Sequence, residues 1–428
     1  MAPRQPQSVE RRNFLLESSA RSLIPMGMAT LLPGSAQRVR QLESTIFDGF
    51  ARWGYHEIIP PTFEYLDVLS TGLPADTLEK CYKFADWTTG RILVLRPDVT
   101  AQIARIVAMG MAGQGLPLRL CYRTTVFRYE PEHAGREREV FQLGVELIGV
   151  DEATMDAEIL TLLFESLKTL GLSDFKISLG HVGFYQALLA KSGMSSQGQK
   201  QAEIAAARKD LPNLERILKS ERIASSKARA ILEAPGRYGR EEVLEWGQKV
   251  AGRDQRLIKP ISRLTQVYRM IDATWITEHL LLDLGEFRGF DYYDGLVFDV
   301  FSGKVGCELG GGGRYNHLIG RFGRDLPSTG FALDIDRIFH ALDHVKNRQF
   351  SSPSSVLVMA PFDRYGLAYK TAQFLRSQGF TVLQETLIGI GDSQIRLARK
   401  RAKESTVGWL VLVGRPRLKA QELIAIRM

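Results

Sequence analysis

The chain has 428 residues, which is enough for two or three domains with at least one sizeable hydrophobic core. Its hydrophobic fraction of 44% and charged fraction of 24% are typical of a soluble globular protein. No apolar run approaches the roughly 18–20 residues of a membrane helix, and the polar, basic N-terminus contains no signal-peptide core. We therefore expect a cytoplasmic protein.

Three cysteines, Cys81, Cys121 and Cys307, are dispersed along the chain. They are too few for a disulfide framework and too far apart in sequence for a typical zinc motif. Buried thiols in a reducing cytosol are the simpler interpretation, and we expect no metal and no cofactor.

The net charge of +8 is unevenly distributed. Residues 353–428 contain 12 Lys and Arg against 5 Asp and Glu, so the first 352 residues are close to neutral. A basic terminal segment indicates a local partner surface and not a general nucleic-acid-binding protein.

The first predicted elements are a helix and a short strand. Apolar side chains recur at helical spacing over residues 36–53, and Gly54 stands where a helix C-cap belongs. The strand over 55–59 is stopped by Pro60 and Pro61. A helix followed by such a strand is common at subunit interfaces, although this signal alone is weak.

The next segment alternates strands and helices. We predict strands over 83–84, 92–95, 118–129, 139–148 and 176–179, and helices over 101–109 and 154–170. A polar loop over 130–138 joins two of these strands, which indicates an antiparallel hairpin. Residues from about 186 to 280 are rich in Ala, Lys, Glu, Arg and Leu, and they predict a helical insertion.

Strands resume over 281–284, 296–301 and 329–333, followed by a helix over 336–345. We place the first domain over 1–346 and a Ser-rich linker over 347–355. Beyond the linker, three strands alternate with two helices, which predicts a small parallel α/β domain over 356–428. Its elements are expected at 356–360, 368–378, 381–383, 393–404 and 408–413.

Two blocks, E-F-R-G-F-D-Y-Y-D-G (286–295) and E-L-G-G-G-G-R-Y-N-H-L (308–318), predict a ligand site. Arg288 can donate two hydrogen bonds to a carboxylate, while the glycines allow close approach of a ligand. Alternatively, Arg288 forms a surface ion pair, the tyrosines are ordinary sheet aromatics, and the glycines form a bulge or tight turn. Together the blocks suit a small ligand with a carboxylate and a flat polar ring.

Four segments, in this order, resemble the motifs of class II aminoacyl-tRNA synthetases of the histidyl type. The segments are 127–142 (second class motif), 288–293 and 311–315 (two histidine-pocket motifs), and 330–337 (third class motif). The resemblance implies an α/β (α+β) fold in which helices flank an antiparallel sheet, with the helical insertion and the small C-terminal α/β domain attached.

The resemblance also implies a pocket for free histidine. Arg288 would bind its carboxylate, and Asp98, Thr100 and Gln142 would accept hydrogen bonds from its ammonium. Its imidazole would contact Glu146, a carboxyl in an apolar strand that is costly to bury without a partner. The remaining expected pocket residues are Tyr292, Tyr293, Gly311 and Gly312.

The nucleotide half of the synthetase site is altered. Arg128, Glu130 and Arg337 stand at matching positions, but Asp334 and Asp336 replace the glycine and glutamate of the third motif. A charged side chain at Asp334 would intrude where a nucleotide should lie, and the loop after residue 130 is acidic. We therefore expect a vestigial nucleotide site and no catalytic residues.

Segments 95–106, 144–149 and 309–315 resemble the ATP phosphoribosyltransferase regulatory subunits, which are non-catalytic relatives of histidyl-tRNA synthetase. The resemblance spans roughly residues 23–341. It implies a role in the first step of L-histidine biosynthesis, with the short-form catalytic subunit as partner and histidine as the effector of feedback regulation. It implies no membrane and makes tRNA an improbable partner.

The helix and strand over 36–61 match the dimer interface of the class, so we expect a dimer or higher oligomer. Residues 356–428 resemble the start of an anticodon-binding domain whose last strands are missing. The basic run 396–403 is a relic, a solvated helix face or a contact for the partner. Two other interpretations stay open, a histidyl-tRNA synthetase with a shortened C-terminal domain and a synthetase-like protein with a different target.

Overall fold

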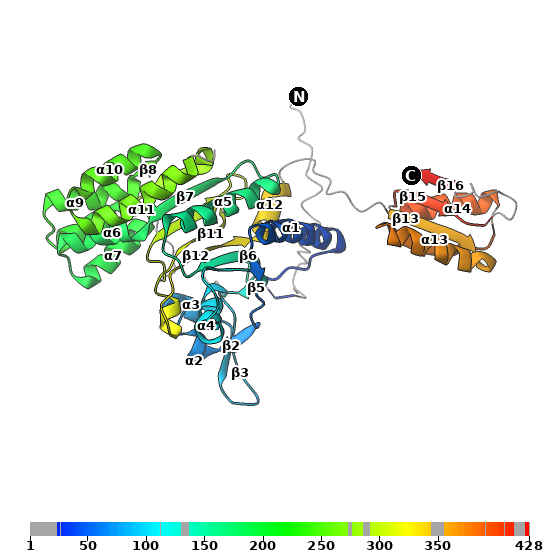
Figure 1. The fold of residues 1–428 in the computed structure, drawn as a ribbon, viewed down its shortest axis with the longest axis horizontal. Coiled ribbons are helices and arrows are strands. Elements are labelled where there is room, and N and C mark those ends of the chain that lie inside the picture. The colour runs from blue at the N-terminus through cyan, green and yellow to red at the C-terminus, as the bar shows by residue number, and fades with distance from the viewer. Residues whose placement is uncertain are drawn as a thin grey trace, which may run out of the picture. The chain divides into compact units, whose positions relative to one another are not determined.

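The computed structural model describes residues 24–25, 27–111, 113–129, 137–272, 276–285, 292–343, 355–389, 391–405, 407–414 and 424–427. The chain divides into two compact units, Met1–Val345 and Lys346–Met428, and each unit has its own sheet (Figure 1). Most of the predicted linker lies outside the described residues. No helix in the described ranges is both long and apolar enough to cross a bilayer.

A nine-stranded sheet forms the centre of the described part of the first unit, in the order β1-β5-β6-β12-β11-β10-β7-β9-β8. Its neighbouring strands run antiparallel except for the parallel pairs β1–β5 and β7–β9. The bounds are β1 His56–Glu57, β5 Leu118–Phe127, β6 Glu139–Ile148, β7 Lys176–His181, β8 Tyr238–Gly239, β9 Leu280–Asp283, β10 Leu296–Phe301, β11 Glu308–Arg314 and β12 Ser328–Asp334.

The predicted hairpin is confirmed, because β5 and β6 pair antiparallel from Leu118–Ile148 to Phe127–Glu139. The four glycines form neither a tight turn nor a loop. They lie inside strand β11, which pairs with β10 on one side and β12 on the other. A register shift beside Val300 shows that the alternative of a bulge was partly correct, since the irregularity falls at the start of the glycine run.

Helices cover one face of this sheet. α1 (Pro33–Arg52) buries Val39, Leu42, Ile46 and Phe50 at helical spacing, and it ends before Gly54, whose φ is +79°. The Phe50 ring meets the Phe331 ring of β12 edge-on, with centroids 5.8 Å apart. α5 (Ala153–Thr169) and α12 (Ile335–Asp343) also contact α1 on this face (Figure 1).

The opposite face carries α4 (Thr100–Gly110) and the apolar cluster around Ile103, Leu120, Tyr122 and Leu318. A small antiparallel sheet, in the order β2-β4-β3, adjoins it. The remaining elements here are β2 Phe63–Tyr65, α2 Leu66–Leu69, α3 Ala75–Glu79, β3 Lys83–Ala85, β4 Ile92–Leu95 and the 3-10 helix η4 Ile319–Phe322.

The helical insertion is confirmed, although it begins at Val182 and not at about residue 186. It leaves the sheet after β7, contributes the short edge strand β8 between η2 and α10, and ends where the chain returns at β9. Its elements are α6 Val182–Ser192, α7 Ser196–Ala207, α8 Leu211–Ser220, α9 Ser225–Glu233, η2 Ala234–Gly236, α10 Glu241–Ala251, α11 Gln255–Asp272 and η3 Thr277–His279.

The second unit is an α/β fold with strand order β14-β13-β15-β16. β13 pairs parallel with β14 and β15, as the alternating pattern predicts, whereas β16 is antiparallel and was not predicted. α13 and α14 pack on separate apolar clusters of the sheet. The bounds are β13 Ser355–Pro361, η5 Phe362–Arg364, α13 Tyr365–Ser377, β14 Thr381–Leu387, α14 Asp392–Glu404, β15 Trp409–Leu412 and β16 Ile424–Arg427.

Candidate functional site

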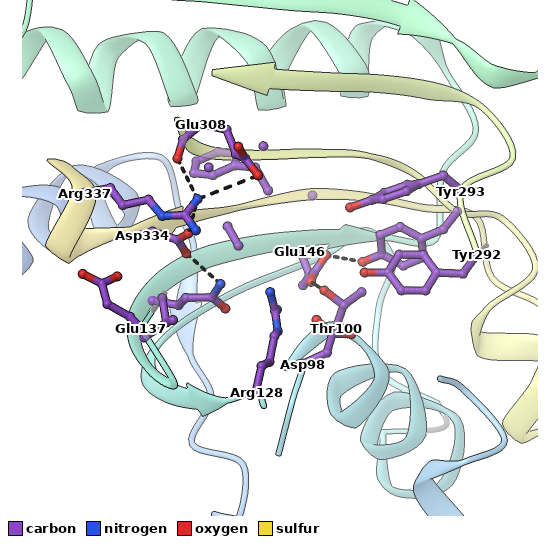
Figure 2. A pocket seen from close by; sticks show the side chains of 18 residues that line it. Asp98, Thr100, Arg128, Glu137, Glu146, Tyr292, Tyr293, Glu308, Asp334 and Arg337 are labelled. Carbon is purple, nitrogen blue, oxygen red and sulfur yellow. Dashed lines mark hydrogen bonds and ion pairs between the residues drawn. The ribbon is translucent and has the colours of Figure 1, made fainter. Parts of the chain in front are cut away.

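A pocket of about 140 Å³ opens on the α4 side of the central strands (Figure 2). A single water needs roughly 10–15 Å³ on this scale, so the pocket holds about ten waters or one compact ligand. Tyr292, Tyr293 and Glu146 lie toward one end, and Glu308, Arg337 and Asp334 lie toward the other. These will be called the aromatic end and the acidic end.

The strand register explains why distant residues meet here. Glu146 of β6 is paired with Gly330 of β12, which is paired with Gly313 of β11. Side chains two residues apart on a strand point to the same face. The next set of paired residues on this face is Gly144, Ala332 and Gly311. The set after that contains Gln142 and Asp334. The period of two therefore presents Glu146, Gln142 and Asp334 to one pocket.

Glu146 is the chemical centre of the aromatic end. Its carboxyl accepts a short hydrogen bond from the Tyr315 hydroxyl and a 2.7 Å hydrogen bond from Thr100 Oγ1. Burial raises the pKa of Glu146 to about 8, although both hydroxyl donors act to lower it. Tyr315 follows directly after β11, and the sequence did not single it out as a site residue. Its place in the G-R-Y motif was the available signal.

Two glycines make room for these side chains. A Cβ at position 330 would lie 2.1 Å from Glu146 Oε2, and a Cβ at position 313 would lie 2.8 Å from the Tyr293 ring. Real Cβ atoms do not approach other atoms so closely. The central strands therefore carry glycine because the pocket side chains lie flat across them.

The structure places most predicted pocket residues together. Asp98, Thr100, Gln142, Glu146, Tyr292, Tyr293 and Gly311 all line the pocket, as do Arg128 and Arg337. Gly312 does not, because it faces the α1 side, where its Cβ would lie 2.8 Å from the Phe298 ring. Gly312 therefore lies on the opposite face of the sheet from Gly311. Arg288 and Glu130 lie outside the described residues.

Asp334 is bound on both sides at the acidic end. Its Oδ1 accepts a 2.8 Å hydrogen bond from Gln142 Nε2, and its Oδ2 lies 3.2 Å from Arg337 Nη1. Arg337 Nη1 also donates to the Glu308 carbonyl oxygen at 2.8 Å. The guanidinium is thus held by groups of the protein itself.

Carboxyl groups outnumber cations along the described pocket wall, where Asp98, Glu137, Glu146, Glu308 and Asp334 face Arg128 and Arg337. Burial raises the pKa of Asp98 and of Glu137 above their usual range, against the nearby arginines. Such carboxyls gain from any ligand that brings a positive charge or hydrogen-bond donors. In the described ranges, no group of three or more His, Cys, Asp or Glu side chains is arranged to hold a metal ion.

The end of β11 also connects the pocket to the insertion. Tyr315 faces Glu146, whereas the side chain of Arg314 reaches Asp156 of α5, with Arg314 Nε 2.8 Å from Asp156 Oδ1. Asp156 Oδ2 in turn accepts a 2.8 Å hydrogen bond from Arg263 Nε of α11. Asp156 is 2% exposed, so this Arg314–Asp156–Arg263 network is buried at its centre.

The sheet order, the insertion and the pocket face together define a class II synthetase-like protein of the histidyl type. The histidyl-tRNA synthetase family model matches residues 27–338. The crystal structure of histidyl-tRNA synthetase from Nostoc shares the fold with a TM-score of 0.79 at 18% identity, covering 95% of this chain and 97% of that one.

Within that class, the sequence relatives identify a narrower family. The ATP phosphoribosyltransferase regulatory subunit of Geobacter sulfurreducens is 33% identical over 405 residues, which cover 95% of this chain and 91% of that protein. The one from Moorella thermoacetica is 37% identical over 393 residues, covering 90% and 97%. A Bacillus halodurans structure described as an ATP phosphoribosyltransferase regulatory subunit/histidyl-tRNA synthetase superposes with a TM-score of 0.80 at 28% identity, covering 92% and 98%. The chain belongs to the family of ATP phosphoribosyltransferase regulatory subunits.

Proposed function

We propose that the chain binds free histidine in this pocket and passes its occupancy to a catalytic ATP phosphoribosyltransferase subunit. In this proposal it takes part in the first step of histidine biosynthesis without chemistry of its own. The names of its relatives support the partner, and self-association through α1 and β1 is part of the proposal. The single observation that supports the ligand is the buried Glu146 carboxyl with its two hydroxyl donors.

The imidazole of histidine matches the aromatic end. One ring N–H can donate to Glu146, and the ring can pack against the Tyr292–Tyr293 pair, whose own centroids are 4.7 Å apart. A ligand without such a donor could not form this hydrogen bond with the buried carboxyl. Sites of this kind discriminate strongly between otherwise similar ligands.

The backbone groups of the ligand match the next part of the pocket. Its ammonium can donate to Asp98 and to Gln142 Oε1, since Gln142 uses its Nε2 on Asp334. Arg288 remains our predicted partner for the carboxylate, and Arg128 is a second arginine on the same wall. The ammonium also supplies the positive charge that this carboxyl-rich wall lacks.

Amino-acid activation is not part of the proposal. It requires free cationic groups at the phosphates of ATP, whereas Arg337 is engaged by Asp334 and by Glu308. Feedback regulation then rests on a coupling free energy between the histidine pocket and the partner's active site, typically about 1–3 kcal/mol.

Calorimetric titration of histidine tests the proposal. We expect the wild-type chain to bind, and we expect Glu146→Gln and Tyr315→Phe to bind roughly 5- to 150-fold more weakly, because each leaves a buried hydrogen-bonding group of the site without its partner. Tyr238→Phe is the matched control, since Tyr238 is 63% exposed and lies in the insertion.

Three outcomes would contradict the proposal. The first is wild-type affinity in both pocket variants, and the second is robust histidine-dependent ATP–pyrophosphate exchange. The third is failure of the short-form catalytic subunit to co-purify with the chain. An Arg288→Ala variant that binds histidine as tightly as wild type would remove Arg288 from the pocket.

A further inference from the structure

We infer that Asp334 determines which class of ligand the pocket accepts, because its carboxylate occupies the anion site that Arg337 and Gln142 would otherwise offer to a phosphate group. The inference rests on the proposed function and specifies it further. It concerns the acidic end of the pocket and not the recognition of the imidazole ring.

The two donors converge on one carboxylate. Gln142 Nε2 donates to Oδ1 at 2.8 Å, and Arg337 Nη1 lies 3.2 Å from Oδ2. Asp334 is 8% exposed, so little water competes for these contacts. An amide and a guanidinium that converge in this way can donate hydrogen bonds to two oxygens of one phosphate group. Asp334 fills that site from within the chain.

Rigid elements hold the carboxylate in place. Asp334 is the last residue of β12 and is directly paired with Gln142 of β6, while Arg337 is in the first turn of α12. The Asp334 carboxylate is therefore tethered close to Arg337 and Gln142. A free anion must compete with the high effective concentration of this carboxylate. It must also approach Asp334 and Glu308, which repel it.

As a consequence, the pocket excludes phosphorylated ligands although Arg337 is still present in its wall. Arg337 keeps a structural role through its bond to the Glu308 carbonyl, which links α12 to β11. The exclusion therefore depends on one side chain. Removing its carboxylate should expose an anion site that the scaffold already contains.

The test is calorimetric titration of ATP in magnesium-free buffer into the full-length wild type, Asp334→Ala and Glu308→Gln. Asp334→Ala removes the carboxylate that fills the site, and we expect it to bind ATP at least tenfold more tightly than wild type. Glu308→Gln removes one charge from the same pocket but leaves the Asp334–Arg337 contact intact. We expect it to stay within threefold of wild type.

Adenosine provides the ligand control, because it lacks phosphates, and its affinity should be the same in all three proteins. The inference is overturned by a gain below tenfold in Asp334→Ala, by an equal gain in Glu308→Gln, or by an equal gain for adenosine. Asp334→Gly replaces Asp334→Ala if thermal melting shows the latter to be unfolded. Histidine binding by the wild type tests the proposed function separately, so the two failures are distinguishable.

Discussion

The Glu146 carboxyl lies in an environment that disfavours its charge. It is 2% exposed, and its hydrogen bonds among the described residues come from the neutral hydroxyls of Tyr315 and Thr100. Burial is the main cause of its raised pKa, and the neighbouring Asp98 adds to it. Glu146 therefore holds a proton at pH values where an exposed glutamate has lost it.

This proton predicts a pH-dependent stability. Between the ordinary pKa of 4.5 and the folded value of about 8, the folded state binds a proton that the unfolded state has lost. The free energy of unfolding therefore falls as the pH rises through this window, by at most about 1.4 kcal/mol per pH unit from this group. Urea unfolding at pH 5 to 7.5 should show a steeper fall in the wild type than in Glu146→Gln.

The comparison uses the difference between the two proteins because other groups titrate in the same range. Burial also raises the pKa of Asp336, to about 7, and this group is present in both proteins. Parallel stability curves for wild type and Glu146→Gln would show that Glu146 is charged throughout the range.

The sequence identified Glu146 because a carboxyl in an apolar strand needs a partner. It could not identify that partner, because the choice among Tyr292, Tyr293 and Tyr315 depends on where the backbone turns after β11. Nor could the sequence show that Gly311 and Gly312 face opposite sides of the sheet. That distinction requires knowing that both belong to strand β11, which had not been predicted.

At the scale of elements, β11 connects two parts of the first unit. Its end presents Tyr315 to the pocket and Arg314 to the Arg314–Asp156–Arg263 network, which includes a residue of insertion helix α11. A shift of β11 on ligand binding would therefore act on both. The network offers a physical connection from the pocket to the insertion.

The same network predicts a large stability effect. Asp156→Asn would remove the buried carboxylate partner of Arg314, whose side chain is 3% exposed, and leave it only the half-exposed Asp151 at 3.4 Å. Breaking a buried ion pair by removing one partner typically costs about 3–5 kcal/mol. Urea unfolding should show a loss of this size, whereas Asp67→Asn, in an exposed pair with Arg91, should change stability far less. Equal effects of the two substitutions would mean that the buried network contributes little.

Most elements could be predicted from periodicity alone. The alternation over residues 118–148 gave the β5–β6 hairpin, and the 3.6-residue spacing over 36–53 gave α1. Strand β11 was not predicted, because glycine has a low strand propensity and has no side chain whose alternation would indicate a strand. At Gly313, the close approach of the Tyr293 ring explains why a larger residue does not fit.

At the scale of the whole molecule, each of the two units has apolar clusters of its own. The apolar clusters around Tyr122 and around Leu69 belong to the first unit, while those around Val358 and Leu357 belong to the second. The net positive charge of the chain lies in the second unit, and the pocket around Glu146 lies in the first. In the proposed function, the basic segment and the ligand site therefore belong to different units.

This separation predicts how histidine changes thermal unfolding. A ligand that binds one folded unit stabilises it by RT ln(1 + [L]/Kd), or about 2.7 kcal/mol at one hundred times Kd. Scanning calorimetry of the full-length chain should therefore resolve two transitions, of which histidine raises only one. The Glu146→Gln variant identifies that transition, because it should lose most of the shift at the same histidine concentration. A single transition, or an equal shift of both, would show that the two units unfold together.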